Sequence, residues 1–167
     1  MNAAIIAYSL TGNAAALGRA LSAALDAEFF LLEENRKRPA KDFFVGGMQA
    51  AFHLGSGLQA LPDAGQADVI VLGMPVWAGS TPPAINTLLK KMDFQNKTVF
   101  AFVTKADPAP QAPQKLVERL KTSIEHKGGA LKGVFAMPSG STPVSRDAAQ
   151  AQAALWAKEI HGRLEKA

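Results

Sequence analysis

The stretch Ile5-Ile6-Ala7-Tyr8-Ser9-Leu10-Thr11-Gly12-Asn13 passes from a short apolar run into a polar turn. A helical pattern follows at once, because the leucines at positions 17, 21 and 25 share one stripe of a helix. A short apolar run bounded by turn residues is typical of a buried strand. The stretch therefore predicts a strand, a tight turn and a helix in direct succession.

The same succession recurs along the rest of the chain. Further apolar runs at residues 29–32, 69–73, 99–103 and 134–137 predict four more strands, and helical patterns at residues 44–54, 82–92, 113–128 and 145–164 follow them. Strands that are apolar throughout are buried on both faces, so helices must cover both sides of a parallel sheet. We predict a single α/β domain over residues 1–167, with a three-layer, doubly wound sheet of five parallel strands.

The composition excludes several classes of protein. Hydrophobic residues make up 48% and charged residues 19%, as in ordinary globular domains. The apolar runs are too short for a membrane span, and the first residues lack the charged region of a secretory signal. The absence of cysteine excludes disulfides and thiolate chemistry and fits a cytoplasmic protein. The three histidines, His53, His126 and His161, lack metal-ligand spacing, so we expect no metal site.

The polar turn at residues 9–13 is the first candidate site. In open parallel sheets, ligands bind beyond the carboxyl ends of the strands. The turn offers hydroxyl and amide side chains, and the helix behind it adds free N–H groups and the positive end of its dipole. We predict that it binds a phosphate group without a cationic side chain, since no lysine or arginine lies between residues 8 and 18. The alternative is that Ser9, Thr11 and Asn13 only cap the helix.

Two segments resemble one known family. Residues 8–13 resemble the phosphate loop of flavodoxins, and the run Gly73-Met74-Pro75-Val76-Trp77-Ala78-Gly79-Ser80-Thr81-Pro82-Pro83-Ala84-Ile85 resembles the second flavin loop of many flavodoxin-like proteins. The order of elements is similar over essentially the whole chain. The resemblance implies a flavodoxin-like fold with strand order 2-1-3-4-5, bound FMN and a role in electron transfer.

The resemblance also implies which residues contact the cofactor, and it implies no catalytic side chain. The expected contacts are Ser9, Thr11, Gly12, Asn13 and Ala14 at the phosphate, Pro75, Val76, Trp77, Ala78 and Gly79 in the second loop, and Thr104, Lys105, Ala106 and Asp107 in the third. Trp77 is expected to stack on the isoalloxazine ring, because its position in a loop argues against burial in the core. Ala78 and Gly79 are expected to bring a backbone group close to the flavin N5.

Two positions depart from the family pattern. Ala14 stands where flavodoxins commonly have a second threonine, a loss of one hydrogen bond that is worth about 0.5–1.5 kcal/mol. The third loop lacks the usual aromatic residue and glycines. One flavin face is therefore expected either to be open to substrate or to be covered by the segment that contains Phe43, Phe44 and His53.

Lys105 suggests a way of setting the redox potential. A cation near the flavin N1 and O2 would stabilise the anionic reduced cofactor and raise its potential. The alternative is that Lys105 is a solvated surface lysine.

Three functions remain open from the sequence. The first is a small FMN electron carrier that serves a redox partner protein or a small electron acceptor. The second is an FMN-dependent reductase that takes hydride from NAD(P)H and reduces a quinone-type acceptor, with the basic run Arg36-Lys37-Arg38 attracting a nucleotide phosphate. The third is a cofactor-free interaction module. Although the net charge is +4, no aromatic residues interleave with that run, so nucleic acid is not an expected partner, and neither is a membrane.

Overall fold

The computed structural model describes residues 2–36, 39, 43–140 and 142–166, and for Phe43 and Phe44 it describes the backbone only. One parallel sheet carries the fold, with strand order β2-β1-β3-β4-β5. The strands are β1 (Ala3–Ala7), β2 (Glu28–Leu31), β3 (Val69–Pro75), β4 (Thr98–Lys105) and β5 (Ala130–Pro138). The helices are α1 (Asn13–Leu25), α2 (Phe43–Ala51), α3 (Pro83–Lys91), α4 (Gln114–Glu125) and α5 (Arg146–Leu164). The predicted fold class and strand order are confirmed.

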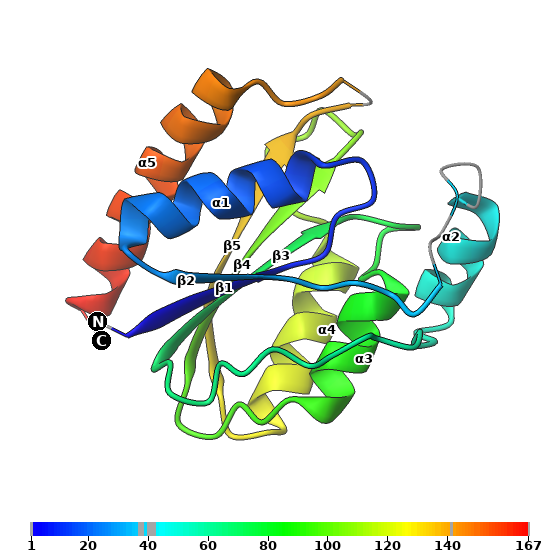
Figure 1. The fold of residues 1–167 in the computed structure, drawn as a ribbon, viewed down its shortest axis with the longest axis horizontal. Helices are drawn as coiled ribbons and strands as arrows, with labels where there is room; N and C mark the ends of the chain where they lie inside the picture. The colour runs from blue at the N-terminus through cyan, green and yellow to red at the C-terminus, as the bar shows by residue number, and fades with distance from the viewer. Residues whose placement is uncertain (1, 37–38, 40–42, 141, 167) are drawn as a thin grey trace.

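The sheet is the middle of three layers. Helices α1 and α5 lie on one face, and α3 and α4 lie on the other (Figure 1). The first interface is formed by apolar side chains including Leu17, Leu21, Phe100, Phe102, Trp156 and Ile160. The second is formed by another set, including Ile70, Leu72, Ile85, Leu88, Leu116 and Leu120. The central strands β1, β3 and β4 are buried on both faces, as their continuous apolar sequences predict.

The two edge strands differ from the prediction. Strand β2 runs from Glu28 to Leu31 and is only partly buried, with Leu31 38% exposed, so burial on both faces was a wrong expectation for this strand. The physical reason is that flanking helices cover the middle of a twisted sheet better than its edge.

Strand β5 is longer than the apolar run at residues 134–137 indicates. Its pairing with β4 shifts register between Val99 and Phe100, which pair with Leu131 and Gly133 and leave Lys132 as an extra residue in a bulge. From α5, Arg163 donates Nη1 to the Lys132 carbonyl oxygen at 2.7 Å. Lysine and glycine interrupt the apolar pattern at the bulge, which is why the sequence alone placed the strand start too late.

The carboxyl ends of the strands meet at one edge of the sheet. There the first residue after β1 and the first residue after β3 each bond to the neighbouring strand, since Tyr8 N donates to Gly73 O of β3 and Val76 N donates to Thr104 O of β4, each at 2.9 Å. The three segments that were expected to contact the cofactor are therefore neighbours in space. None of the helices in the described part of the chain has the length and apolarity that a membrane span needs.

Candidate functional site

The loop after β1 leads into an uncapped helix. Gly12 occupies the N-cap position of α1 with φ 96°, a left-handed conformation that glycine adopts without strain. Its N–H donates to Ser9 Oγ at 3.1 Å, but no side chain caps the first turn of α1. Thr11 is exposed at the N-terminal end of α1, while Ala14 is buried and contributes its backbone N–H alone. Capping is therefore not the role of this turn, and its helix N–H groups stay available to an anion.

Asn13 has a role that was not predicted. Its side chain is buried, with Nδ2 donating to Thr142 O at 3.0 Å and Oδ1 accepting from Val144 N at 2.9 Å. Asn13 thus fastens the start of α1 to the segment before α5, more than a hundred residues away. Only its backbone N–H remains among the donors of the helix mouth.

The loop after β3 contains a two-residue reverse turn. Trp77 and Ser80 exchange backbone hydrogen bonds of 3.1 and 2.9 Å across it. Ala78 and Gly79 in between have φ values of 48° and 69°. Two consecutive positive φ angles are typical of a type I′ turn, which glycine and asparagine favour and alanine does not. The turn therefore places a strained alanine at its exposed tip.

Trp77 itself is buried, which corrects the expectation drawn from its loop position. The residue is 6% exposed and belongs to the core between the sheet and α3 and α4. Its ring meets that of Tyr8 edge-on, with centroids 5.8 Å apart and an interplanar angle of 79°. Ala78 and Gly79 form the tip of the turn, and their positive φ angles reverse the chain directly after Trp77. Stacking of Trp77 on a flavin stays a prediction, while Pro75 and Val76 lie half-buried beside it.

The third segment that was expected to contact the cofactor, residues 104–107, lies partly in strand β4 and partly in the loop after it. Thr104 and Lys105 end β4 and are buried, whereas Ala106 and Asp107 are exposed. The Lys105 side chain is only 3% exposed, and its Nζ lies 3.9 Å from Asp107 Oδ2. Lys105 is therefore not a solvated surface lysine. Burying an ammonium group is costly unless an anion or several acceptors surround it, so its position at this edge favours a role toward a ligand.

A partly buried polar cluster that was not predicted lies next to the second loop. It consists of His53, Ser80, Thr81, Asn86 and Arg119, and is called here the polar cluster. Ser80 Oγ lies 3.3 Å from His53 Nδ1, and Thr81 Oγ1 donates to Asn86 Oδ1 at 2.6 Å. Arg119 Nε donates to Thr81 Oγ1 and Asn86 Oδ1 at 3.1 and 3.2 Å, and its Nη2 donates to Asn86 Oδ1 at 3.1 Å.

The polar cluster joins four segments of the chain. His53 follows α2, Ser80 and Thr81 follow the reverse turn, Asn86 lies on α3, and Arg119 lies on α4. Asn86 Nδ2 also donates to the Leu54 carbonyl oxygen at 2.8 Å. No sequence signal predicts these contacts, apart from the position of two members directly after the second flavin-like motif.

The electrostatics of the polar cluster are positive. Burial lowers the pKa of the Arg119 guanidinium, which nevertheless stays charged at any physiological pH. Burial also lowers the pKa of His53, and the nearby charges of Arg119 and then Lys115 lower it further, whereas a hydrogen bond to the backbone of Ala50 raises it. His53 is therefore neutral near pH 7.

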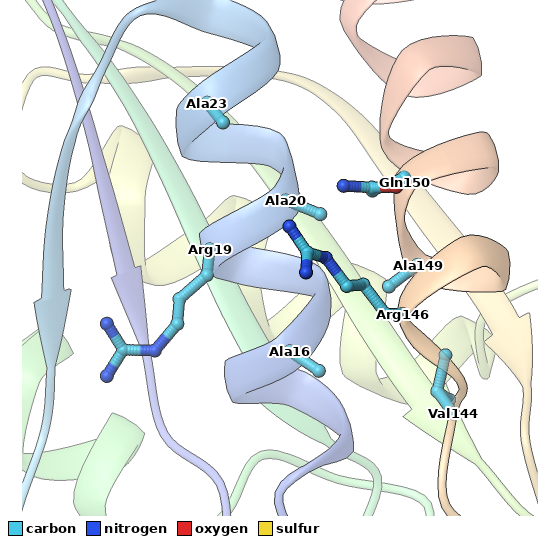
Figure 2. Close-up of a pocket in the computed structure, with 8 residues that line it drawn as sticks. All are labelled: Ala16, Arg19, Ala20, Ala23, Val144, Arg146, Ala149 and Gln150. Carbon is cyan, nitrogen blue, oxygen red and sulfur yellow. The ribbon is translucent and has the colours of Figure 1, made fainter.

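An open groove on the other face of the sheet is not part of this site. It lies between α1 and α5, has a volume of about 480 Å³ and is lined mainly by alanines, including Ala16, Ala20 and Ala149. Figure 2 shows Arg146 reaching toward α1 beside Ala20, while Arg19 points away from α5. The Arg19 guanidinium instead lies 4.6 Å from the centroid of the Phe29 ring. None of the residues expected to contact the cofactor lines this groove.

Two sequence hypotheses fall partly outside the described residues. In the basic run, Lys37 and Arg38 are not among them, while Arg36 lines a cavity of about 260 Å³ that it shares with Tyr8, Ser9 and the carboxyl-bearing residues Glu33 and Glu34. The side chains of Phe43 and Phe44 are likewise outside the description. Within the described ranges, no three histidine, aspartate or glutamate side chains gather as metal ligands would.

Comparison with known proteins supports the family suggested by the motifs. Residues 55–137 match the sequence profile of the family described as flavodoxin, and no curated protein matches the chain. A protein described as a flavoprotein from Bacteroides uniformis has a similar structure at 21% identity, with a TM-score of 0.71 over 90% of this chain and 96% of that one.

Two further solved structures have the same fold. A flavoprotein from Lactobacillus acidophilus, solved in complex with FMN, is 21% identical, with a TM-score of 0.67 over 81% of this chain and 92% of that one. The two-electron reduced flavodoxin of Megasphaera elsdenii is 17% identical, with a TM-score of 0.56 over 93% and 98%. The matched profile and the shared strand order together identify the chain as a flavodoxin-like protein.

Proposed function

We propose that this protein binds FMN at the carboxyl edge of its sheet and transfers electrons to and from a redox partner. The observation that carries the proposal is the uncapped first turn of α1, directly beyond the end of β1. A helix mouth with unpaired N–H groups binds a phosphate group through hydrogen bonds and through the helix dipole. A flavodoxin-like protein has its phosphate loop at this point, as residues 8–13 indicate.

The residues present fit the phosphate end of FMN. Ser9 and Thr11 supply hydroxyls, and the backbone of Gly12, Asn13 and Ala14 supplies N–H donors. In the described structure, the Gly12 N–H donates to Ser9 Oγ. A bound phosphate oxygen would take the place of this hydroxyl as the acceptor. Since no cationic residue lies in the loop, we expect the phosphate to be held by dipoles and hydroxyls alone.

The residues at the other two loops fit the ring of FMN. The reverse turn at Ala78 and Gly79 offers backbone groups at an exposed tip, and Trp77 offers an aromatic edge beneath it. Lys105 holds a positive charge at the end of β4, where it would stabilise electron density on the ring. Bound flavin accepts and donates electrons, and the chain supplies binding, orientation and polarity.

The test is a flavin titration in which the ligand itself is the control. We expect FMN to bind with quenched fluorescence at one per chain, and riboflavin, which lacks the phosphate, to bind at least about tenfold more weakly because charged hydrogen bonds are worth about 1.5–3 kcal/mol. Thr11→Val should weaken the binding of FMN and leave the affinity for riboflavin unchanged. Thr122→Val on the outside of α4 is the matched control. Equal affinities for FMN and riboflavin would refute the phosphate assignment.

Electron transfer is tested separately on the loaded protein. The flavin absorbance should bleach on reduction by dithionite and return when an acceptor protein or a quinone is added. Bleaching by NADPH without any added reductase would instead make the protein an enzyme. A colourless protein that takes up no FMN would leave only the interaction module.

A further inference from the structure

Positive side chains converge beside the turn that follows β3. Arg119 and Lys115 lie one helical turn apart on α4, and both act on His53, which follows α2. Arg119 is half-buried, and its hydrogen bonds go to the hydroxyl of Thr81 and the amide oxygen of Asn86. Both acceptors are neutral, so they orient the guanidinium without compensating its charge.

No carboxylate balances these charges in the part of the chain that the structure describes. Neither Arg119 nor Lys115 has an ion-pair partner there. Glu118, the adjacent carboxylate in the sequence, accepts a hydrogen bond from Gln114 Nε2 at 2.7 Å. Two cations spaced four residues apart on a helix repel each other. An anion placed between them would remove that repulsion and satisfy the guanidinium.

His53 is the third residue beside these two cations. Its backbone has φ 56°, an uncommon conformation for a residue other than glycine. Its Nδ1 lies 3.3 Å from Ser80 Oγ, which anchors the imidazole to the second loop. An anion beside the ring would favour its charged form and would thereby add a third cation to the site.

We propose that Arg119, Lys115 and His53 form a second anion site, which binds the phosphate group of a small molecule. Arg119 Nη1 has no partner among the described residues, and a planar guanidinium fork matches the spacing of phosphate oxygens. The site is separate from the phosphate loop at residues 9–14, since Arg119 and Lys115 lie on α4 and His53 follows α2. Its binding of phosphate does not require FMN.

The position of this anion site suggests what the phosphate belongs to. Ser80, which contacts His53, directly follows the reverse turn that we propose to contact the flavin ring. A phosphate held here would keep a phosphorylated electron donor or acceptor, such as a nucleotide, beside the flavin. This last step rests on the proposed function, whereas the anion site does not.

The experiment follows the imidazole signals of the protein by NMR, with one FMN added per chain so that residues 9–14 do not compete for the probe and no free FMN remains to occupy the anion site. On addition of inorganic phosphate, we expect the His53 signal to shift and its pKa to rise, while His126 and His161 serve as internal controls. Titration with 2′-AMP in a second sample separates the sources: tighter binding than inorganic phosphate identifies a nucleotide, and equal binding identifies free phosphate. Acetate should leave His53 unmoved.

Charge-removing variants test the residues. Arg119→Gln should weaken phosphate binding by about tenfold or more, in line with the loss of a charge-assisted hydrogen bond. Because Arg119 also orients Thr81 and Asn86, Lys115→Gln is the second variant and should weaken binding without disturbing those contacts. Lys121→Gln, an exposed lysine on α4 that lies about 200° around the helix from Arg119, removes the same charge and should have no effect.

Two results would overturn the anion site. One is a His53 signal that does not respond to phosphate, and the other is equal movement of all three histidines, which reports ionic strength alone. A failure of FMN to bind would refute the proposed function, yet the His53 response would remain as the measure of this site.

Discussion

Replacement of Asn13 by alanine tests whether the start of α1 is held by the segment before α5. The variant removes the hydrogen bonds to Thr142 O and from Val144 N at a position that is 5% exposed. At about 0.5–1.5 kcal/mol for each bond, unfolding should cost about 1–3 kcal/mol less than in the unmodified protein. For a chain of this size, that corresponds to a fall in Tm of about 2–12 °C.

The assay is urea unfolding followed by far-UV circular dichroism, together with a thermal melt. Asn2→Ala is the matched control, because it removes one exposed side-chain hydrogen bond, to Gln66 O, and should change stability by less than about 0.5 kcal/mol. An Asn13→Ala protein as stable as this control would refute the fastening role.

The same substitution separates fastening from phosphate binding. Because the Asn13 amide is engaged by residues 142–144, Asn13→Ala should leave the FMN affinity of the folded protein within about threefold, well under 1 kcal/mol. Asn13→Asp keeps an acceptor for Val144 N but adds a negative charge at the N-terminal end of α1. It should weaken the binding of FMN about tenfold or more, because this charge repels the phosphate. A larger loss of affinity in the alanine variant than in the aspartate variant would show that the amide contacts the phosphate directly.

Four further predictions address other parts of the structure. Lys105→Met should lower the flavin midpoint potential by about 40–90 mV, which is the effect of removing a unit charge roughly 4–8 Å from the ring at an effective dielectric constant of about 20. A midpoint potential that potentiometry finds unchanged would reject a role of Lys105 in setting it. Gly73→Ala should lower stability by about 1–3 kcal/mol in thermal melts, because a Cβ there would overlap with the buried Phe102 ring. Ala78→Asn should raise Tm by about 1–4 °C, since asparagine tolerates the left-handed conformation of that turn, and a lowered Tm would contradict the strain. Because the pKa of His53 is lowered in the folded protein, the unfolded chain takes up a proton on this histidine more readily as the pH falls below about 6.5. The free energy of unfolding should therefore decline as the pH falls through and below this value. His53→Gln should make that decline smaller in urea titrations at several pH values.

All five strands could be predicted from the sequence, but the exposure and the bounds of the two edge strands could not. Strands β1, β3 and β4 are continuous apolar runs because both of their faces are covered, which makes them recognisable without tertiary information. The bulge at Lys132 and the partial exposure of Leu31 depend on what lies beside the strand, and that depends on the fold.

The candidate site divides in the same way. The loops at residues 9–13 and 75–79 could be located, because each directly follows a predictable strand and parallel strands bring their carboxyl ends together. Burial of Trp77 could not be predicted, since it depends on core residues of other segments that pack against its ring. The contacts of Asn13 and of Arg119 join segments far apart in the sequence, so no local sequence pattern predicts them.

The bulge at the outer edge of β5 has a consequence for self-association. An open sheet edge can add a strand from a second molecule, and such pairing leads to filaments and aggregates. Here Lys132 interrupts the regular ladder, and Arg163 occupies its carbonyl oxygen, so an incoming strand would meet a kinked backbone with one acceptor already taken. The same few residues that made the strand hard to recognise thus help to keep the molecule from polymerising through that edge.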